Sequence, residues 1–175
     1  MIAHTFFRYI SIPFAILLAS CNSAQANPSS TCQKNERVIF SCNFANGKTA
    51  LVCTNTLKSD NQFVEYRFGK APKVEMTYRA DQASNNAMFH SAEVLYASNA
   101  EKVFWFKQAD FAYLIHMPMR GGPSLEVMRK QKTVANLQCL KGWSGVRGDS
   151  DITSKHISGH GKFSDDELFR TLDKK

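Results

Sequence analysis

Cysteines are the most reactive side chains in this 175-residue sequence, and four of the five fall in the part expected to remain after export. They are Cys32, Cys42, Cys53 and Cys139. Metal sites built from thiolates use close pairs such as C-x-x-C, and the gaps here are longer. An even number of cysteines in an oxidising compartment instead predicts two disulfides.

Four cysteines allow three pairings, and the sequence alone does not choose among them. We favour the pair Cys32–Cys53 together with Cys42–Cys139. The second bridge would tie the first strand to the last and close a long loop, which the chain-entropy model stabilises most.

Histidines are the next candidates, because His156 and His160 are four residues apart and could hold a metal ion on a helix. Gly159 and Gly161 argue against a helix here, since glycine is a poor helix former. We therefore expect no metal site. His116 alternates with apolar neighbours and is expected to be a hydrogen-bonded structural histidine.

Catalytic motifs are missing from the sequence, which contains neither G-x-S-x-G nor H-E-x-x-H. We expect no catalytic residue and no cofactor. The alternative is a hydrolase of an envelope polymer, which would use scattered residues such as His90, Glu93 and Asp110.

Three residues are binding candidates. Trp105 and Tyr113, on neighbouring strands, could share an outward face that binds a sugar or a peptide; core packing is the competing interpretation. Arg67 is the third candidate. Its competing role is structural, because a regular hairpin would set Arg67 opposite Glu75, and opposite charges stabilise a strand pair.

The elements that position these residues are strands joined by short turns. Alternating apolar side chains predict one β domain over residues 37–140, with Asn46-Gly47 as the strongest turn signal. Strands are expected at 38–44, 48–53, 63–68, 73–78, 103–106, 111–116, 125–128 and 134–139, with weaker ones near 89 and 94–96. The links favour an all-β fold, an antiparallel up-and-down barrel or sandwich of about eight strands, and leave no room for parallel crossovers.

The C-terminal part has a different composition. Residues 141–162 are rich in Gly, Ser, Asp and His and predict a flexible linker. A short amphipathic helix is expected over 163–175, because Ser164 and Glu167 form a capping box and Leu168 continues an apolar stripe. That stripe would dock on its own domain or on a partner.

The N-terminal part resembles an export signal, with Arg8 followed by an apolar stretch too short to span a membrane. Two cleavage sites remain open. Residues 18–21 resemble a lipobox, so that a lipoprotein signal would cover 1–20 and Cys21 would be lipidated. Otherwise a signal peptide of residues 1–26 is removed. Residues 27–36 would then form an N-terminal tether.

The charge of the chain is basic, with a formal net charge of +7. A basic surface outside the cytoplasm could meet anionic lipid heads, phosphates or wall carboxylates. We interpret the densest run, residues 129–132, as a solvated turn. Nucleic acid is not an expected partner, because no reader motif is present.

A set of short motifs resembles a group of uncharacterised small secreted proteins of Gram-negative bacteria. The most specific part is Tyr66-Arg67-Phe68-Gly69, and the others are Cys32, Phe40-Ser41-Cys42, Gly47-Lys48, Leu51-Val52-Cys53, Val74-Glu75 and Leu137-Gln138-Cys139. This resemblance implies export but no activity.

A looser likeness is to the membrane-bound lysozyme inhibitors, which are small periplasmic β-barrels that insert a Ser-Gly loop into the lysozyme cleft. The similar string here, residues 144–147, lies after the last cysteine and outside the expected barrel. Lysozymes are basic and so is this chain, which weakens charge complementarity.

These observations together predict a periplasmic or secreted protein, with an outer-membrane lipoprotein as the anchored version. We expect a non-enzymatic binding or inhibitor module whose partner is an envelope protein or glycan. The alternatives are a lysozyme-inhibitor-like protein and an envelope-polymer hydrolase.

Overall fold

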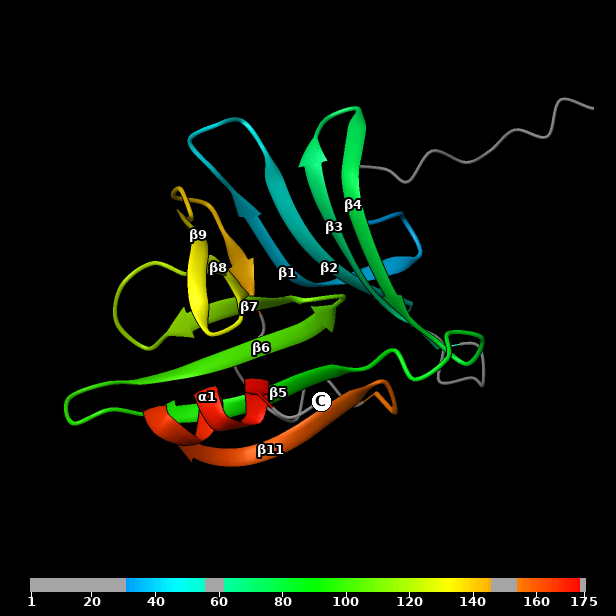
Figure 1. Cartoon of the computed structure of the whole chain (residues 1–175). Helices are drawn as coiled ribbons and strands as arrows, with labels where there is room; N and C mark the ends of the chain where they lie inside the picture. Colours follow the sequence, from blue (N-terminus) through cyan, green and yellow to red (C-terminus); the bar gives the residue numbers. More distant parts are fainter. Residues whose placement is uncertain (1–30, 56–61, 146–153, 174–175) are drawn as a thin grey trace, which may run out of the picture.

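The alternating segments fold as strands of two sheets that pack face to face (Figure 1). The computed structural model describes residues 31–55, 62–145 and 154–173. The first sheet has the order β10-β1-β2-β3-β4. Its strands are β1 (Glu36–Asn43), β2 (Thr49–Asn55), β3 (Val64–Lys70), β4 (Lys73–Ala80) and β10 (Ser144–Gly145).

The second sheet has the order β11-β5-β6-β7-β8-β9. Its strands are β5 (Phe89–Leu95), β6 (Ala100–Gln108), β7 (Phe111–Pro118), β8 (Ser124–Arg129), β9 (Lys132–Gln138) and β11 (Ile157–Ser164). One helix, α1 (Asp165–Asp173), follows β11. Among the described residues the sheets form a sandwich, which confirms the all-β prediction and selects the sandwich over the closed barrel.

The core lies between the two sheets and is rich in aromatic rings. Phe106 stacks on Tyr78 at a centroid distance of 4.2 Å and on Tyr113 at 4.9 Å. The most deeply buried members come from both sheets and include Phe40, Tyr66, Phe89, Phe104 and Ile115. The period of two therefore places these side chains as the alternation predicts.

Both disulfides have the pairing that loop closure favours. Cys42–Cys139 closes a separation of 97 residues and joins β1 of the first sheet to the end of β9 in the second. Cys32–Cys53 closes a separation of 21 residues and fastens the chain before β1 to β2.

The hairpin of β3 and β4 departs from the expected register. The turn is short, with Lys70 opposite Lys73, and a bulge follows between Phe68 and Gly69, so that Arg67 lies opposite Thr77 rather than opposite Glu75. A Cβ at Gly69 would overlap the carbonyl of Lys73, so the close approach of the two strands requires glycine. Glu75 pairs with Lys48 instead, at 2.6 Å.

The C-terminal residues correct the linker prediction for 141–162. Residues 144–145 form β10 and residues 157–162 belong to β11, while residues 146–153 lie outside the described part. β11 pairs in parallel with β5, against the expectation of antiparallel pairs alone. Backbone hydrogen bonds hold β11, which buries few apolar side chains, so its composition resembles that of a loop.

The helix α1 begins two residues later than predicted and docks on its own domain. The backbone amide of Ser164 donates to Glu167 at 2.6 Å, as in a capping box. Leu168 is buried on the outer face of the second sheet, beside Phe163 and Leu172. Figure 1 places α1 beside β5 and β11, on the side away from β1 to β4. No helix among the described residues is long and apolar enough to cross a membrane.

The N-terminal predictions are tested only in part. The signal over 1–26 and the lipidation of Cys21 lie outside the described residues. Of the tether, residues 31–36 are fixed rather than tethering, because Cys32 is in a disulfide and Glu36 begins β1. Residues 129–132 form the predicted turn, in which Lys130 and Gln131 have positive φ, as the tightest hairpin turns require.

Candidate functional site

Arg67 is the first binding candidate, and the structure buries it on the outer face of the first sheet. Its side chain is 3% exposed and donates to both oxygens of Glu36 at 2.8 Å and to Glu65 at 2.5 Å. A further hydrogen bond reaches the carbonyl oxygen of Thr31. Burial opposes ionisation of Glu36, but the hydrogen bond from Arg67 holds the pKa of Glu36 below its usual value. We therefore assign Arg67 a structural role.

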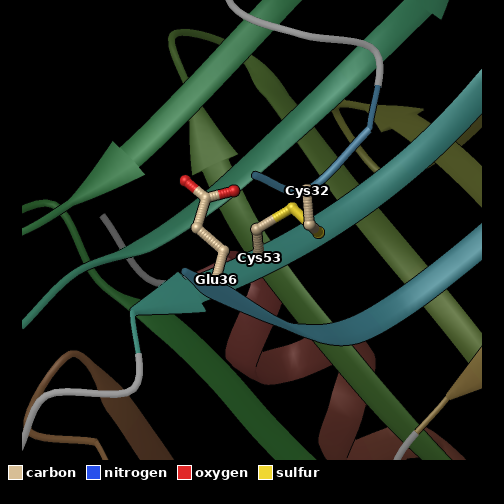
Figure 2. Close-up of side chains that lie close together, drawn as sticks. All are labelled: Cys32, Glu36 and Cys53. Carbon is tan, nitrogen blue, oxygen red and sulfur yellow. A yellow bond between two sulfur atoms is a disulfide. The ribbon is translucent and has the colours of Figure 1, made fainter. Parts of the chain in front are cut away.

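Next to this cluster lie the three groups that come closest to a metal site among the described residues, namely Cys32, Glu36 and Cys53 (Figure 2). The two sulfur atoms are joined in a disulfide, which removes the thiolates that a metal would need. The carboxylate of Glu36 is held by Arg67. The disulfide and the ion pair of this cluster hold the residues just before β1 on the first sheet.

His116 lies on the outer face of the second sheet between two carboxylates. Its Nδ1 lies 3.0 Å from Glu101 and its Nε2 lies 3.1 Å from Glu126. Burial alone would lower the pKa of His116, but the hydrogen bonds to both carboxylates raise it to about 9. A protonated imidazole with both nitrogens engaged cannot act as a general base. The prediction of a satisfied structural histidine is confirmed.

The residues considered for a hydrolase do not converge. His90 and Glu93 lie on opposite faces of β5, since their separation is odd. Asp110 lies in the turn between β6 and β7, where it is 3.7 Å from Arg129. The described structure therefore gives these three residues no shared cleft.

Trp105 and Tyr113 do not form a shared platform. Phe106, not Trp105, pairs with Tyr113 across β6 and β7, so the two candidates point to opposite faces of the sheet. Trp105 is 1% exposed beneath the C-terminal segment, and Tyr113 packs against the central core. Side chains alternate between the two faces along each strand. Trp105 is one residue before Phe106, the cross-strand partner of Tyr113, so the rings of Trp105 and Tyr113 lie on opposite faces.

His156 and His160 do not act as a pair. His156 is 7% exposed, and its Nε2 has no hydrogen-bond partner in the described structure. His160 faces His90 instead, with 2.9 Å between Nε2 and Nδ1. As predicted, the two glycines are not in a helix.

A hollow lies between α1 and the ends of two hairpins, β6–β7 and β8–β9. Its volume is about 600 Å³, within the range of small-molecule sites. The lining residues are Lys107, Ala109, Asp110, Phe111, Ala112, Met128, Lys130, Gln131, Phe169 and Leu172.

This hollow, which we call the helix pocket, has an apolar floor and a basic rim. Ala112 and Met128 belong to the buried cluster under α1, and Phe169 stands at the edge with 42% of its surface exposed. Lys107, near the end of β6, and Lys130, in the turn between β8 and β9, line the rim. Such a site suits a ligand that has an apolar part and a negative charge.

The charges around the helix pocket favour an anion. Its one carboxylate, Asp110, lies 3.7 Å from Arg129, whose guanidinium also lies 5.3 Å from the ring centre of Phe111. Asp110 is thus partly neutralised, and the lysines of the rim set the sign of the local field.

Sequence reasoning missed the helix pocket, although it noted two of its parts. The apolar stripe of α1 and the basic run 129–132 were both visible in the sequence. The sequence did not indicate that β11 pairs with β5 and so places α1 on the second sheet. Without β11, no pattern places Phe169 near Lys107.

The Ser-Gly string compared with lysozyme inhibitors is part of a sheet. Ser144 and Gly145 pair with Ser41 and Phe40 of β1. A Cβ at Gly145 would lie 3.0 Å from the sulfur of Met117, so the glycine packs closely against the second sheet. The string therefore does not project as a loop at these two residues.

Comparisons with known proteins add no relative to this description. No family model, no curated protein and no solved structure matches the chain.

Proposed function

We propose that this protein is an extracytoplasmic binding protein whose helix pocket holds a small amphiphile, an alkyl or acyl chain with an anionic head. The observation that carries the proposal is the pairing of an apolar floor, made by Ala112 and Met128 with Phe169 at its edge, with two lysines at the rim. The formal net charge of +7 would also attract an anion over a longer range.

The amphiphile would bind in one orientation. Its apolar part would cover Met128 and Phe169, which removes apolar surface from water at about 25 cal/mol per Å². Its anionic head would lie between Lys107 and Lys130 at the turns.

Export and anchoring are part of the same proposal. The signal-like segment 1–26 would take the chain out of the cytoplasm, and two disulfides suit an oxidising compartment. Lipidation at Cys21 would hold the pocket near the membrane, where amphiphiles are concentrated; cleavage after Ala26 would release a periplasmic or secreted carrier. An envelope protein or glycan as the ligand would be the competing outcome.

The test is a calorimetric titration with three ligands of equal chain length and different heads: decanoate, decyltrimethylammonium and decyl maltoside, each below its micelle concentration. We expect decanoate to bind most tightly. Lys107→Glu with Lys130→Glu should weaken the binding of decanoate by up to about thirtyfold, because each surface ion contact contributes up to about 1 kcal/mol.

Two matched controls separate the pocket from general stickiness. Met119 is 67% exposed and lies outside the pocket lining, so Met119→Ser should leave binding unchanged, whereas Phe169→Ser should weaken every ligand. Equal affinity for all three heads, or equal effects of the two serine variants, would refute the proposed site.

A further inference from the structure

Two imidazoles meet at the edge of the second sheet, in a place that the helix pocket does not use. His90 lies on β5 and His160 on β11, 70 positions apart in the chain. Their nitrogens, Nδ1 of His90 and Nε2 of His160, lie 2.9 Å apart. This contact joins β5 and β11, which are neighbouring parallel strands of the second sheet.

A bulge in β11 lies at this contact. Gly159 pairs with Ser91 and Lys162 pairs with Glu93, so two residues of β11 oppose one of β5. His160 is in this bulge, next to Gly161, which has a φ of +74°. Bulges redirect side chains and are enriched at functional sites.

Trp105 supports both rings from below. Its indole is stacked on His90 with a centroid distance of 5.3 Å and on His160 with 5.2 Å. Phe163 closes one side, at 5.6 Å from the ring centre of His160. The indole itself is 1% exposed, while both imidazoles are only half-buried. The rings are therefore positioned by packing, and solvent reaches them.

We propose that His90 and His160 are two ligands of a copper(II) site. With metal–nitrogen bonds of about 2.0 Å, nitrogens 2.9 Å apart subtend about 90° at the metal, the angle between neighbouring ligands in a tetragonal ion. A tetrahedral zinc ion would hold the same nitrogens about 3.3 Å apart. In the absence of an ion the two nitrogens share a hydrogen bond, and binding would replace it by two metal–nitrogen bonds, with water in the other positions.

The protonation state of the pair suits this chemistry. Burial lowers the pKa of His90 to about 4, with further lowering from the neighbouring His160 and Lys107. Burial also lowers the pKa of His160. Both shifts favour the neutral ring, as a metal ligand requires, and the ring that donates in this contact would carry its single proton on its other nitrogen when the ion binds.

Fluorescence provides a direct test, because Trp105 touches both rings and copper(II) quenches a nearby indole. The protein carries a second tryptophan, so the titration with copper(II) is made in the Trp143→Phe background. We expect saturable quenching with one ion per chain. His90→Gln and His160→Gln should each weaken the binding at least tenfold, and zinc(II) should compete poorly.

Glu93→Gln is the matched control, because it removes an exposed carboxylate three residues along β5, on the opposite face from His90, and should leave the affinity unchanged. Electron paramagnetic resonance of the unsubstituted protein supplies a readout that does not depend on variants and should detect two imidazole nitrogens on the copper. Unsaturable quenching, fewer than two nitrogens, or unchanged affinity in both histidine variants would overturn the proposal. None of these outcomes depends on the ligand of the helix pocket.

Discussion

Each sheet of the sandwich has an outer face covered by one end of the described chain, and the two covers differ in kind. Residues 31–36 cover the first sheet through a disulfide and an ionic cluster around Arg67. β11 and α1 cover the second sheet through backbone pairing and a few apolar contacts, centred on Leu168. One cover is sealed and the other is partial.

The difference indicates where function can lie. Around Arg67 the carboxylates and the guanidinium satisfy one another, which leaves a stable but occupied surface. Under α1 the cover ends before the hairpin turns, so the helix pocket, the exposed ring of Phe169 and the His90–His160 pair all lie on this side. We therefore assign stability to the first outer face and binding to the second.

The largest expected effect is on the first face. Arg67→Met would leave Glu36 and Glu65 buried without their shared cation, and breaking a buried pair costs about 3–5 kcal/mol. Lys48→Met is the control, since it breaks the exposed pair with Glu75 and should cost less than about 1 kcal/mol. Urea unfolding of both variants measures the difference, and equal losses would contradict a sealed first face.

The disulfide of the first face should affect stability alone. Cys32→Ser with Cys53→Ser opens a closure of 21 residues, which the chain-entropy model values at about 3 kcal/mol. Binding of decanoate should be unchanged, because the helix pocket lies on the other sheet. A variant that folds but loses its affinity for decanoate would show that the two faces are coupled.

The second face should respond to pH where the first does not. The pKa of His116 is raised to about 9, so its contribution is complete below the unfolded value near 6.5 and is lost as the pH rises toward 9. The loss amounts to about 3 kcal/mol, at 1.36 kcal/mol per pKa unit. Unfolding at pH 6, 7.5 and 9 should follow this decline, and His116→Gln should flatten it. A wild-type free energy of unfolding that does not change between pH 6 and pH 9 would contradict this role of His116.

The smallest loss of stability is expected for the cover formed by β11 and α1. Leu168→Ala removes the one fully buried side chain of α1 and should cost about 2–3 kcal/mol, felt as local opening of the C-terminal segment. Hydrogen exchange should quicken over residues 157–173 and stay slow in β6 and β7. Phe169→Ala, at an exposed position of the same helix, should leave exchange unchanged. Faster exchange throughout the sandwich would mean that α1 is part of the core.

Local patterns were enough to predict most of the sandwich. The alternation around Phe40, Phe106 and Leu125 gave the hairpins, and loop closure gave the pairing of Cys42 with Cys139. These features depend on neighbours in sequence or on chain entropy, so they are readable without coordinates.

The rest depends on contacts that no local pattern encodes. The short turn and the bulge at Gly69 together moved the partner of Arg67 from Glu75 to Thr77, because each shifts every later pair by one residue. β11 is held by backbone hydrogen bonds, which carry no side-chain signature. The helix pocket and the His90–His160 pair both follow from the return of β11 to β5, so the sequence revealed neither.

The most direct test of binding at the second face is a nuclear magnetic resonance titration of the disulfide-intact protein with decanoate. If decanoate binds in the helix pocket, amide and methyl signals of Phe111, Met128, Lys130 and Phe169 shift together and saturate. Signals of Arg67 and its neighbours stay fixed. Shifts centred on the Arg67 face, or no saturable shifts at all, would contradict the assignment of binding to the partly covered sheet.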